Sequence, residues 1–252
     1  MIYRAVFFSL CLLASSAHAE DEMVIAFDDG RYDEAFTLAA ATSETADRYA
    51  FQARSLLAQA IHHGEQPPNE VLKRAESLAA KALQLDKRHL EGRIQLALAL
   101  SMQTRVMSLS EINGSGYGTL SRDLAESILE DNPQNVWAHG FLSVWHIEAR
   151  RVAGPFLSGM AGASVKDGQA HFEKSVETDP ENLVVIWQYA RALMALNPKK
   201  YDDEINGLLS DIRDLSPKDA LEAVVKDRAS RFETEMTSRN FDRVKSLAQT
   251  TL

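Results

Sequence analysis

Apolar and small residues recur every three or four positions through most of the chain, which is the spacing of one face of an α-helix. The clearest stretch is residues 167–193. Its first periodic run must end at Asp179-Pro180, because proline cannot continue a helix, and a second run begins directly afterwards. This stretch therefore predicts two antiparallel helices joined by a short turn.

Small residues in this stretch occupy the positions at which the two helices would cross. Gly168, Phe172 and Ser175 share one face of the first helix. Tyr189 and Ala190 lie on the apolar face of the second, where a small side chain permits close approach. Strict apolar alternation bounded by hairpin turns is missing from the sequence, so the pattern predicts an all-α protein.

The order small-x3-aromatic-x2-small-x4-proline in residues 168–180, followed by the apolar-small pattern of residues 186–193, resembles the tetratricopeptide repeat (TPR). Gly30 to Ala35 repeat the glycine-x-tyrosine-x2-alanine turn of that family, and Leu96-Ala97 repeat its apolar-small pair. The resemblance runs from about residue 24 to residue 217. It implies a TPR-like α-solenoid of about four to five degenerate helix pairs, closed by a C-terminal capping helix.

A second resemblance concerns the chain as a whole. Long, irregular helical repeats behind an export signal are similar to the periplasmic helical-repeat component associated with some TRAP-type transporters. This resemblance implies a solute-binding accessory protein of a transport system as an alternative to a protein-binding scaffold.

The first nineteen residues have the organisation of a secretory signal peptide. Arg4 supplies the positive charge, residues 6–13 form the apolar core, and Ala17 to Ala19 offer a small-x-small cleavage site. The alternative is a membrane anchor, but the apolar run is far shorter than the roughly 20 residues that span a bilayer. We therefore expect residues 1–19 to be cleaved, leaving a periplasmic or secreted domain of residues 20–252 without a transmembrane span.

Charge, cysteine content and motifs argue against several classes of function. The formal net charge is −9, which repels phosphate backbones and makes nucleic acid an improbable partner. The only cysteine, Cys11, lies inside the signal segment, so the exported chain would have no thiol chemistry. Residues 20–252 carry none of the common metalloprotease, nucleophile-elbow or phosphate-loop motifs, so we expect no enzyme and no cofactor.

Two histidines are the remaining candidates for chemistry. His139 and His146 are seven residues apart on one predicted helix. No aspartate or glutamate at helical spacing completes a ligand set beside them, so a packed or surface pair is the favoured interpretation and no metal site is expected.

Two glycine-rich insertions stand out, near residues 107–119 and 151–167, and together they hold six of the twelve glycines. Each lies between the first and second helix of a repeat unit, so both should project from the same edge of a solenoid. The second also contains Phe156 and further apolar residues. It is either a functional loop, such as a lid or an interface, or a plug that folds back onto its own core.

A concave surface lined by the first helix of each pair is what the TPR resemblance implies. The candidate binding residues are Ile94, Trp137, Val144, Phe156, Trp187 and Arg191. Aromatic residues and arginine are typical anchors at protein interfaces. The alternative is that Trp137 and Trp187 belong to the core.

The sequence thus favours an exported scaffold that binds a protein or peptide partner of the cell envelope in its groove. The solute-binding alternative would place a small anionic solute near Arg191. An enzyme with dispersed residues is a third class, and oligomerisation stays open.

Overall fold

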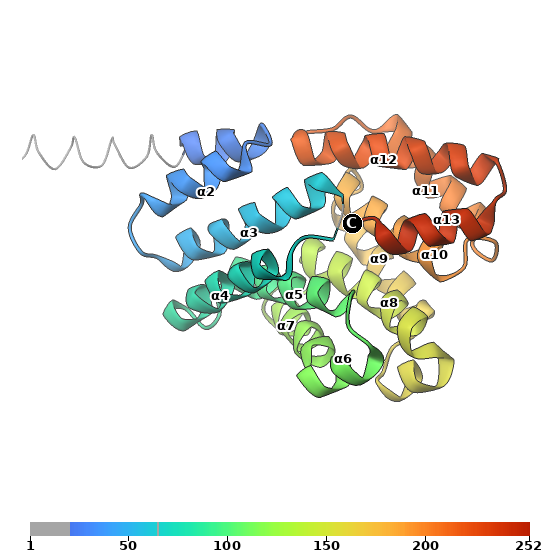
Figure 1. Cartoon of the computed structure of the whole chain (residues 1–252), viewed down its shortest axis with the longest axis horizontal. Coiled ribbons are helices and arrows are strands. Elements are labelled where there is room, and N and C mark those ends of the chain that lie inside the picture. The colour runs from blue at the N-terminus through green and yellow to red at the C-terminus, as the bar shows by residue number, and fades with distance from the viewer. Residues whose placement is uncertain (1–20, 65) are drawn as a thin grey trace, which may run out of the picture.

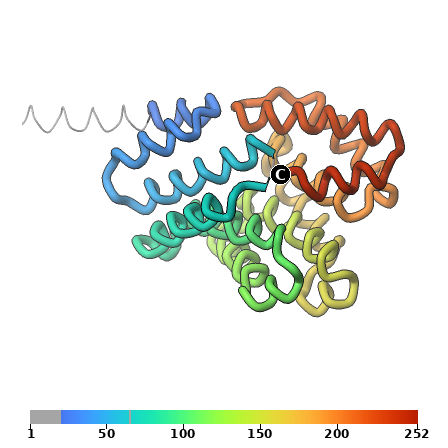
Figure 2. The backbone as a smooth tube through the Cα atoms, viewed as in Figure 1, coloured from blue at the N-terminus to red at the C-terminus, as the bar shows by residue number. Residues whose placement is uncertain are grey.

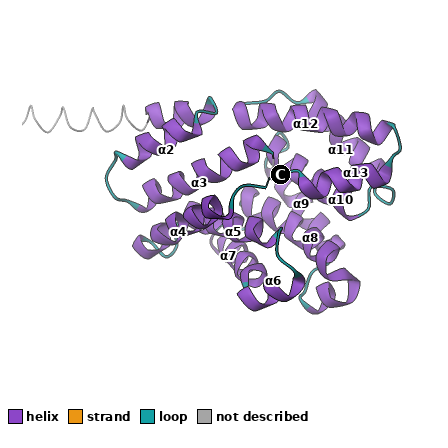
Figure 3. Cartoon of the chain, in the orientation of Figure 1, coloured by secondary structure: helices purple, strands orange, loops and turns teal. Residues whose placement is uncertain are grey.

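The computed structural model describes residues 21–64 and 66–252, and every element within them is a helix (Figure 3). The all-α prediction is confirmed. The predicted signal segment, residues 1–19, lies outside the described residues.

Helices that follow one another along the chain pack as antiparallel pairs (Figure 1). The pairs are residues 21–28 with α2 (Tyr32–Ala40), α3 (Ala46–His63) with α4 (Asn69–Leu85), α5 (Leu90–Thr104) with α7 (Tyr117–Asp131), α8 (Val136–Met160) with α9 (Val165–Thr178), and α10 (Leu183–Leu196) with α11 (Asp202–Asp214). Two further helices follow, α12 (Ala220–Thr237) and α13 (Phe241–Thr250). The C-terminal cap, predicted as one helix, therefore consists of two helices.

Small residues do occupy helix contacts, but the close contact of residues 167–178 is with the preceding helix α8 rather than, as the sequence predicted, with residues 183–193. Ala97 and Ala190 are fully buried. At Gly168, an added Cβ would lie 2.9 Å from the backbone oxygen of Ser143, so α8 and α9 approach each other through a position that has no room for a side chain.

Replacing Ala190 with leucine should lower the free energy of unfolding by about 1–3 kcal/mol, because the buried contact has no space for three more carbon atoms. Ala170→Leu, at an exposed position of α9, is the matched control and should change it little. Urea denaturation followed by circular dichroism measures both. Equal stability of the two variants would contradict the packing described here.

The two insertions contain helical structure. In the first, α6 (Leu109–Ser115) begins with a capping box between Ser108 and Glu111. In the second, α8 continues to Met160 across a break at Gly154, whose φ of 71° lies in the left-handed region that favours glycine.

Both insertions lie at the same edge of the molecule, as predicted, at the bottom of Figure 1. Arg122 of α7 donates a hydrogen bond to the backbone oxygen of Ala161, and the Trp145 indole donates one to that of Gly118. Phe156 is 77% exposed and Met160 is 74% exposed. Phe156 and Met160 therefore stay outside the core, which argues against the plug, one of the two alternatives left open by the sequence.

Helix α12 reaches back to the N-terminal helices and closes the solenoid into a ring (Figure 2). A Cβ at Gly30 would lie 2.9 Å from the Cβ of Ala220, and one at Gly64 would lie 2.6 Å from Nη2 of Arg228. Both glycines also have positive φ angles, 77° and 79°. Glycine is therefore required twice where α12 reaches the N-terminal helices.

Candidate interaction site at the centre of the ring

Helix α13 carries the chain into the centre of the ring, where its last backbone carbonyl groups need partners. The amide of Thr251 closes the final turn on Leu247, so the carbonyl groups that follow have no acceptor role inside the helix. Such groups also form the negative end of the helix dipole. Arginine side chains from the surrounding helices donate hydrogen bonds to these carbonyl groups.

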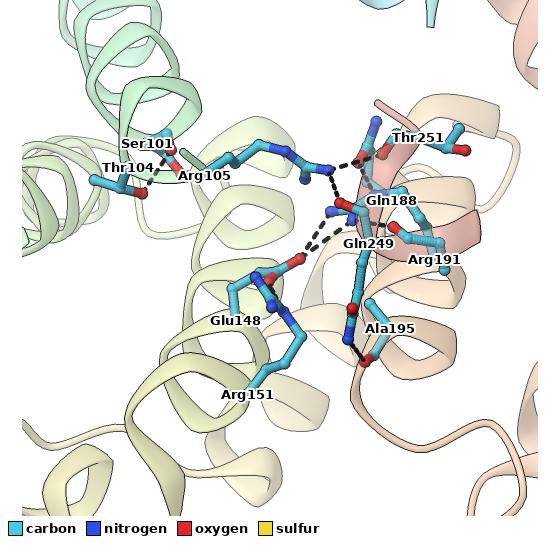
Figure 4. A network of polar contacts seen from close by, with 11 residues as sticks. Ser101, Thr104, Arg105, Glu148, Arg151, Gln188, Arg191, Ala195, Gln249 and Thr251 are labelled. Carbon is cyan, nitrogen blue, oxygen red and sulfur yellow. Dashed lines mark hydrogen bonds and ion pairs between the residues drawn. The ribbon is translucent and has the colours of Figure 1, made fainter. Parts of the chain in front are cut away.

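Two arginines donate to these carbonyl groups (Figure 4). Arg105 follows α5 and donates through Nη2 to the oxygens of Gln249, at 3.0 Å, and Thr251, at 2.9 Å. Arg191 of α10 donates through Nη1 to the oxygen of Ala248 at 3.2 Å. Positive charge at a helix C-terminus is favourable, and charge-assisted bonds are stronger than neutral ones.

A third arginine joins this segment to α12 and to the end of α3, which meet where the ring closes. Arg228 of α12 donates to the oxygen of Leu252 at 3.1 Å and to the oxygen of His62 at 2.6 Å. The amide of Leu252 donates in turn to the oxygen of Gly64 at 3.1 Å. Residue 252 is therefore held through its backbone by α12 and by the end of α3.

The side chain of Leu252 completes the site. It is only 4% exposed and packs into an apolar cluster built by α3, α4 and α5. The buried members of that cluster are Leu56, Leu57, Ala60, Leu72, Ala75, Ala99 and Met102. Segment 248–252 is thus bound by arginines at its backbone and by an apolar pocket at its last side chain.

Glu148 of α8 partly balances the positive charge of the arginines at the ring centre. Its Oε1 accepts from Arg191 at 3.2 Å and its Oε2 accepts from Arg151 at 2.5 Å. Burial alone would raise the pKa of Glu148, but Arg191, Arg151 and Arg105 outweigh it and hold that pKa below its usual value. The carboxylate therefore stays ionised at neutral pH, and the centre carries more positive than negative charge.

Burial and repulsion by Arg191 lower the pKa of Arg105 to about 10. This value still leaves the guanidinium protonated at neutral pH. Arg105 is therefore a partly desolvated cation that gains from any carbonyl or carboxylate oxygen placed beside it.

Trp187 and Ile94 do not line an open surface, which corrects the prediction made from the TPR register. Trp187 is fully buried and packs edge to face on Phe232 of α12, with ring centroids 5.3 Å apart. Ile94 is 6% exposed inside the cluster that joins α5, α7 and α8. Both side chains are large and apolar. Helix α12 covers Trp187, whereas α7 and α8 enclose Ile94.

The other predicted residues are scattered. Arg191 lies at the ring centre, and Val144 packs against the same core cluster as Trp187. Trp137 is 48% exposed at the start of α8, whereas Phe156 projects from the second insertion. The structure brings only Arg191 to the site described here.

Sequence reasoning missed most of the site: Arg105, Arg151, Arg228, Gln249 and Leu252. Arg105 and Leu252 fall at the ends of periodic runs, where no helical spacing assigns them to a face. The sequence did contain one clue to the role of this segment. Residues 241–252 keep an apolar spacing, although the segment around them is polar and was interpreted as a simple capping helix.

Three histidines gather between α8 and α9, away from the segment just described. The His139 and His171 Nδ1 atoms lie 2.8 Å apart, and the His146 and His171 rings stack with centroids 5.5 Å apart. Burial, then repulsion by His139 and His146, lowers the pKa of His171 to about 4. Burial also lowers the pKa of each of the other two.

The fold should therefore lose stability on acidification. The unfolded chain takes up protons near pH 6.5, whereas folded His171 resists them down to about pH 4, so the free energy of unfolding falls as pH drops through this window. Allowing for partial exposure, we expect a loss of about 1–2 kcal/mol between pH 7 and pH 5. His171→Gln should flatten this slope and Gln169→Ala, exposed on the same helix, should not. Parallel slopes for all three proteins would contradict the assignment.

Neither a metal cluster nor a membrane-spanning helix is found in the described part of the chain. Within residues 21–64 and 66–252, no group of three or more histidine, cysteine or acidic side chains is arranged to hold a metal ion. Among those residues, no helix combines the length and the apolar content that crossing a bilayer requires.

Among solved structures, the chain is similar to a thermophilic TPR protein of Thermus thermophilus, known from its crystal structure. The TM-score is 0.62 at 16% sequence identity, and the match covers 85% of this chain and 98% of that one. At this identity the likeness concerns the fold, and it confirms the TPR-like architecture predicted from the repeats. No protein-family model matches the chain, and no curated protein sequence matches it.

Proposed function

We propose that this protein is a protein-interaction scaffold that binds a peptide segment of a partner at the centre of its ring. One observation carries the proposal: Arg105, Arg191 and Arg228, from three separate parts of the solenoid, converge on the backbone oxygens of one short segment. Backbone oxygens are common to all peptides, and the pocket around Leu252 adds selectivity for an apolar side chain. A TPR-like fold is typical of such scaffolds.

Photo-crosslinking inside the producing cell tests this function. A photoreactive residue in place of Ser101, beside Arg105 in Figure 4, should give a covalent adduct with another protein. The same residue in place of Asp211, exposed on α11, is the matched control and should not give that adduct. Adducts from Asp211 but none from Ser101 would place the interaction on the outer face and contradict the proposal.

We also propose that the scaffold works outside the cytoplasm, on the strength of the signal-like pattern in residues 1–19. Expressed from its full sequence, the protein should be recovered in the periplasm or the medium with Glu20 at its N-terminus. Mass spectrometry of the purified protein decides this. An intact Met1, or a lipid on Cys11, would contradict it.

A further inference from the structure

Helix α13 is bound in the manner of a peptide ligand. Only one stripe of it is buried, with Val244 and Ala248 fully covered and Phe241 and Leu247 partly covered. Its other positions are polar and face solvent. An amphipathic helix that lays one apolar stripe against a groove is a recurring mode of peptide recognition.

The neighbouring helix α10 is built differently. Eleven of its fourteen residues are buried, so it is a central element of the core. By comparison, α13 contributes only two fully buried residues, Val244 and Ala248, to the core that it shares with α10, α11 and α12, so its departure would uncover one side of α10. Its own contribution to the core is the single stripe that faces α10.

The turn before α13 favours release. Among the described residues, Arg239 is the one non-glycine residue with a positive φ, 55°. An L-residue in this conformation costs about 1 kcal/mol or more. The polar contact of Arg239 with Asp202 is exposed and adds little in return.

We propose that the ring centre is a receptor for the C-terminal end of a helix, and that residues 241–252 are its built-in occupant, which a partner segment must displace. This inference rests on the proposed function and names the partner's chemistry. The partner segment is a short amphipathic helix whose last carbonyl groups meet Arg105 and Arg191, followed by an extended residue and an aliphatic side chain. Thr251 and Leu252 show that arrangement here.

Tethering explains how a weak ligand keeps the site filled. A segment joined by a short linker has an effective concentration on the order of 1 mM. The site is therefore occupied in the intact chain even if the free segment binds with a Kd of about 1–100 µM, well below that concentration. A partner of higher affinity, or one present in a multivalent array, competes with it.

The test begins with the full, folded chain. A recognition sequence for a specific protease is inserted after Ser238, in the exposed turn between α12 and α13, and the purified protein is then cut. At about 0.1 µM, below the expected Kd, the fragment from residue 239 onward should dissociate during gel filtration. Circular dichroism should show that the remaining helices still unfold cooperatively.

A fluorescent synthetic peptide of residues 239–252 should then bind the cut protein, and binding to the uncut protein should be at least tenfold weaker. A Leu252→Asp peptide should bind at least tenfold more weakly, because it loses the apolar pocket. A Lys245→Ala peptide, altered on the exposed side of α13, is the matched control and should bind within twofold of the parent.

Retention of the fragment against a hundredfold excess of labelled peptide, or loss of the remaining fold when the fragment leaves, would overturn this inference and make α13 a permanent part of the core. The result is separate from that of the crosslinking experiment. Peptide exchange without any partner adduct at Ser101 would overturn the proposed function instead.

Discussion

Replacing Glu148 with alanine is expected to destabilise the protein by about 3–5 kcal/mol. Glu148 is the one carboxylate among the described residues that pairs with Arg191, whose side chain is 2% exposed. The change also removes the partner of Arg151. Burying an uncompensated charge is among the most destabilising effects of a single substitution. Thermal and urea denaturation followed by circular dichroism measure the loss.

Glu126→Ala is the matched control for this prediction. Glu126 pairs with Arg122 at 3.6 Å on the surface of α7, with its side chain 53% exposed. Such pairs contribute at most about 0.5 kcal/mol. A loss below about 1 kcal/mol for Glu148→Ala, comparable to that of the control, would show that the arginines of the ring centre are solvated and that the site is not as compact as described.

The second large effect is expected for Trp187→Ala, at about 3–5 kcal/mol. The indole is fully buried between α10 and α12, and its removal leaves a cavity that the surrounding helices cannot fill. Trp137→Ala removes the same side chain at a position that is 48% exposed, so it should cost less than about 1 kcal/mol. Both are measured by urea denaturation.

These two tryptophans separate the core from the surface in one experiment. Similar losses for both variants would mean that Trp187 is accessible, as the groove predicted from sequence would require. A large loss for Trp187 alone supports the packing of α12 over that face of α10.

The helix pairs could be predicted because local rules determine them. Asp179-Pro180 ends one helix whatever surrounds it, and Gly168 and Ala190 fit only where two helices cross. The curvature of the solenoid is not determined by local rules. It depends on many small rotations between neighbouring pairs, and closure depends on contacts such as that of Gly30 with Ala220, which lie far apart in the sequence.

The site could be predicted only in part for the same reason. Arg191 was identified because its helix was assigned to the concave surface in the repeat register, and the structure places it at the ring centre. Its partners at the centre come from α13, and nothing in the spacing of residues 241–252 says that this helix turns inward. Of the predicted residues only Arg191 lies at the ring centre, and the sequence did not reveal that α13 contacts it there.

Native-state hydrogen exchange of the intact protein tests most directly whether α13 is a separable occupant of the ring. We expect amides from Val244 to Ala248 to exchange through a local opening, with protection well below that of α10, whose amides open only when the whole ring unfolds. Equal protection of the two helices, at the level of global unfolding, would contradict it.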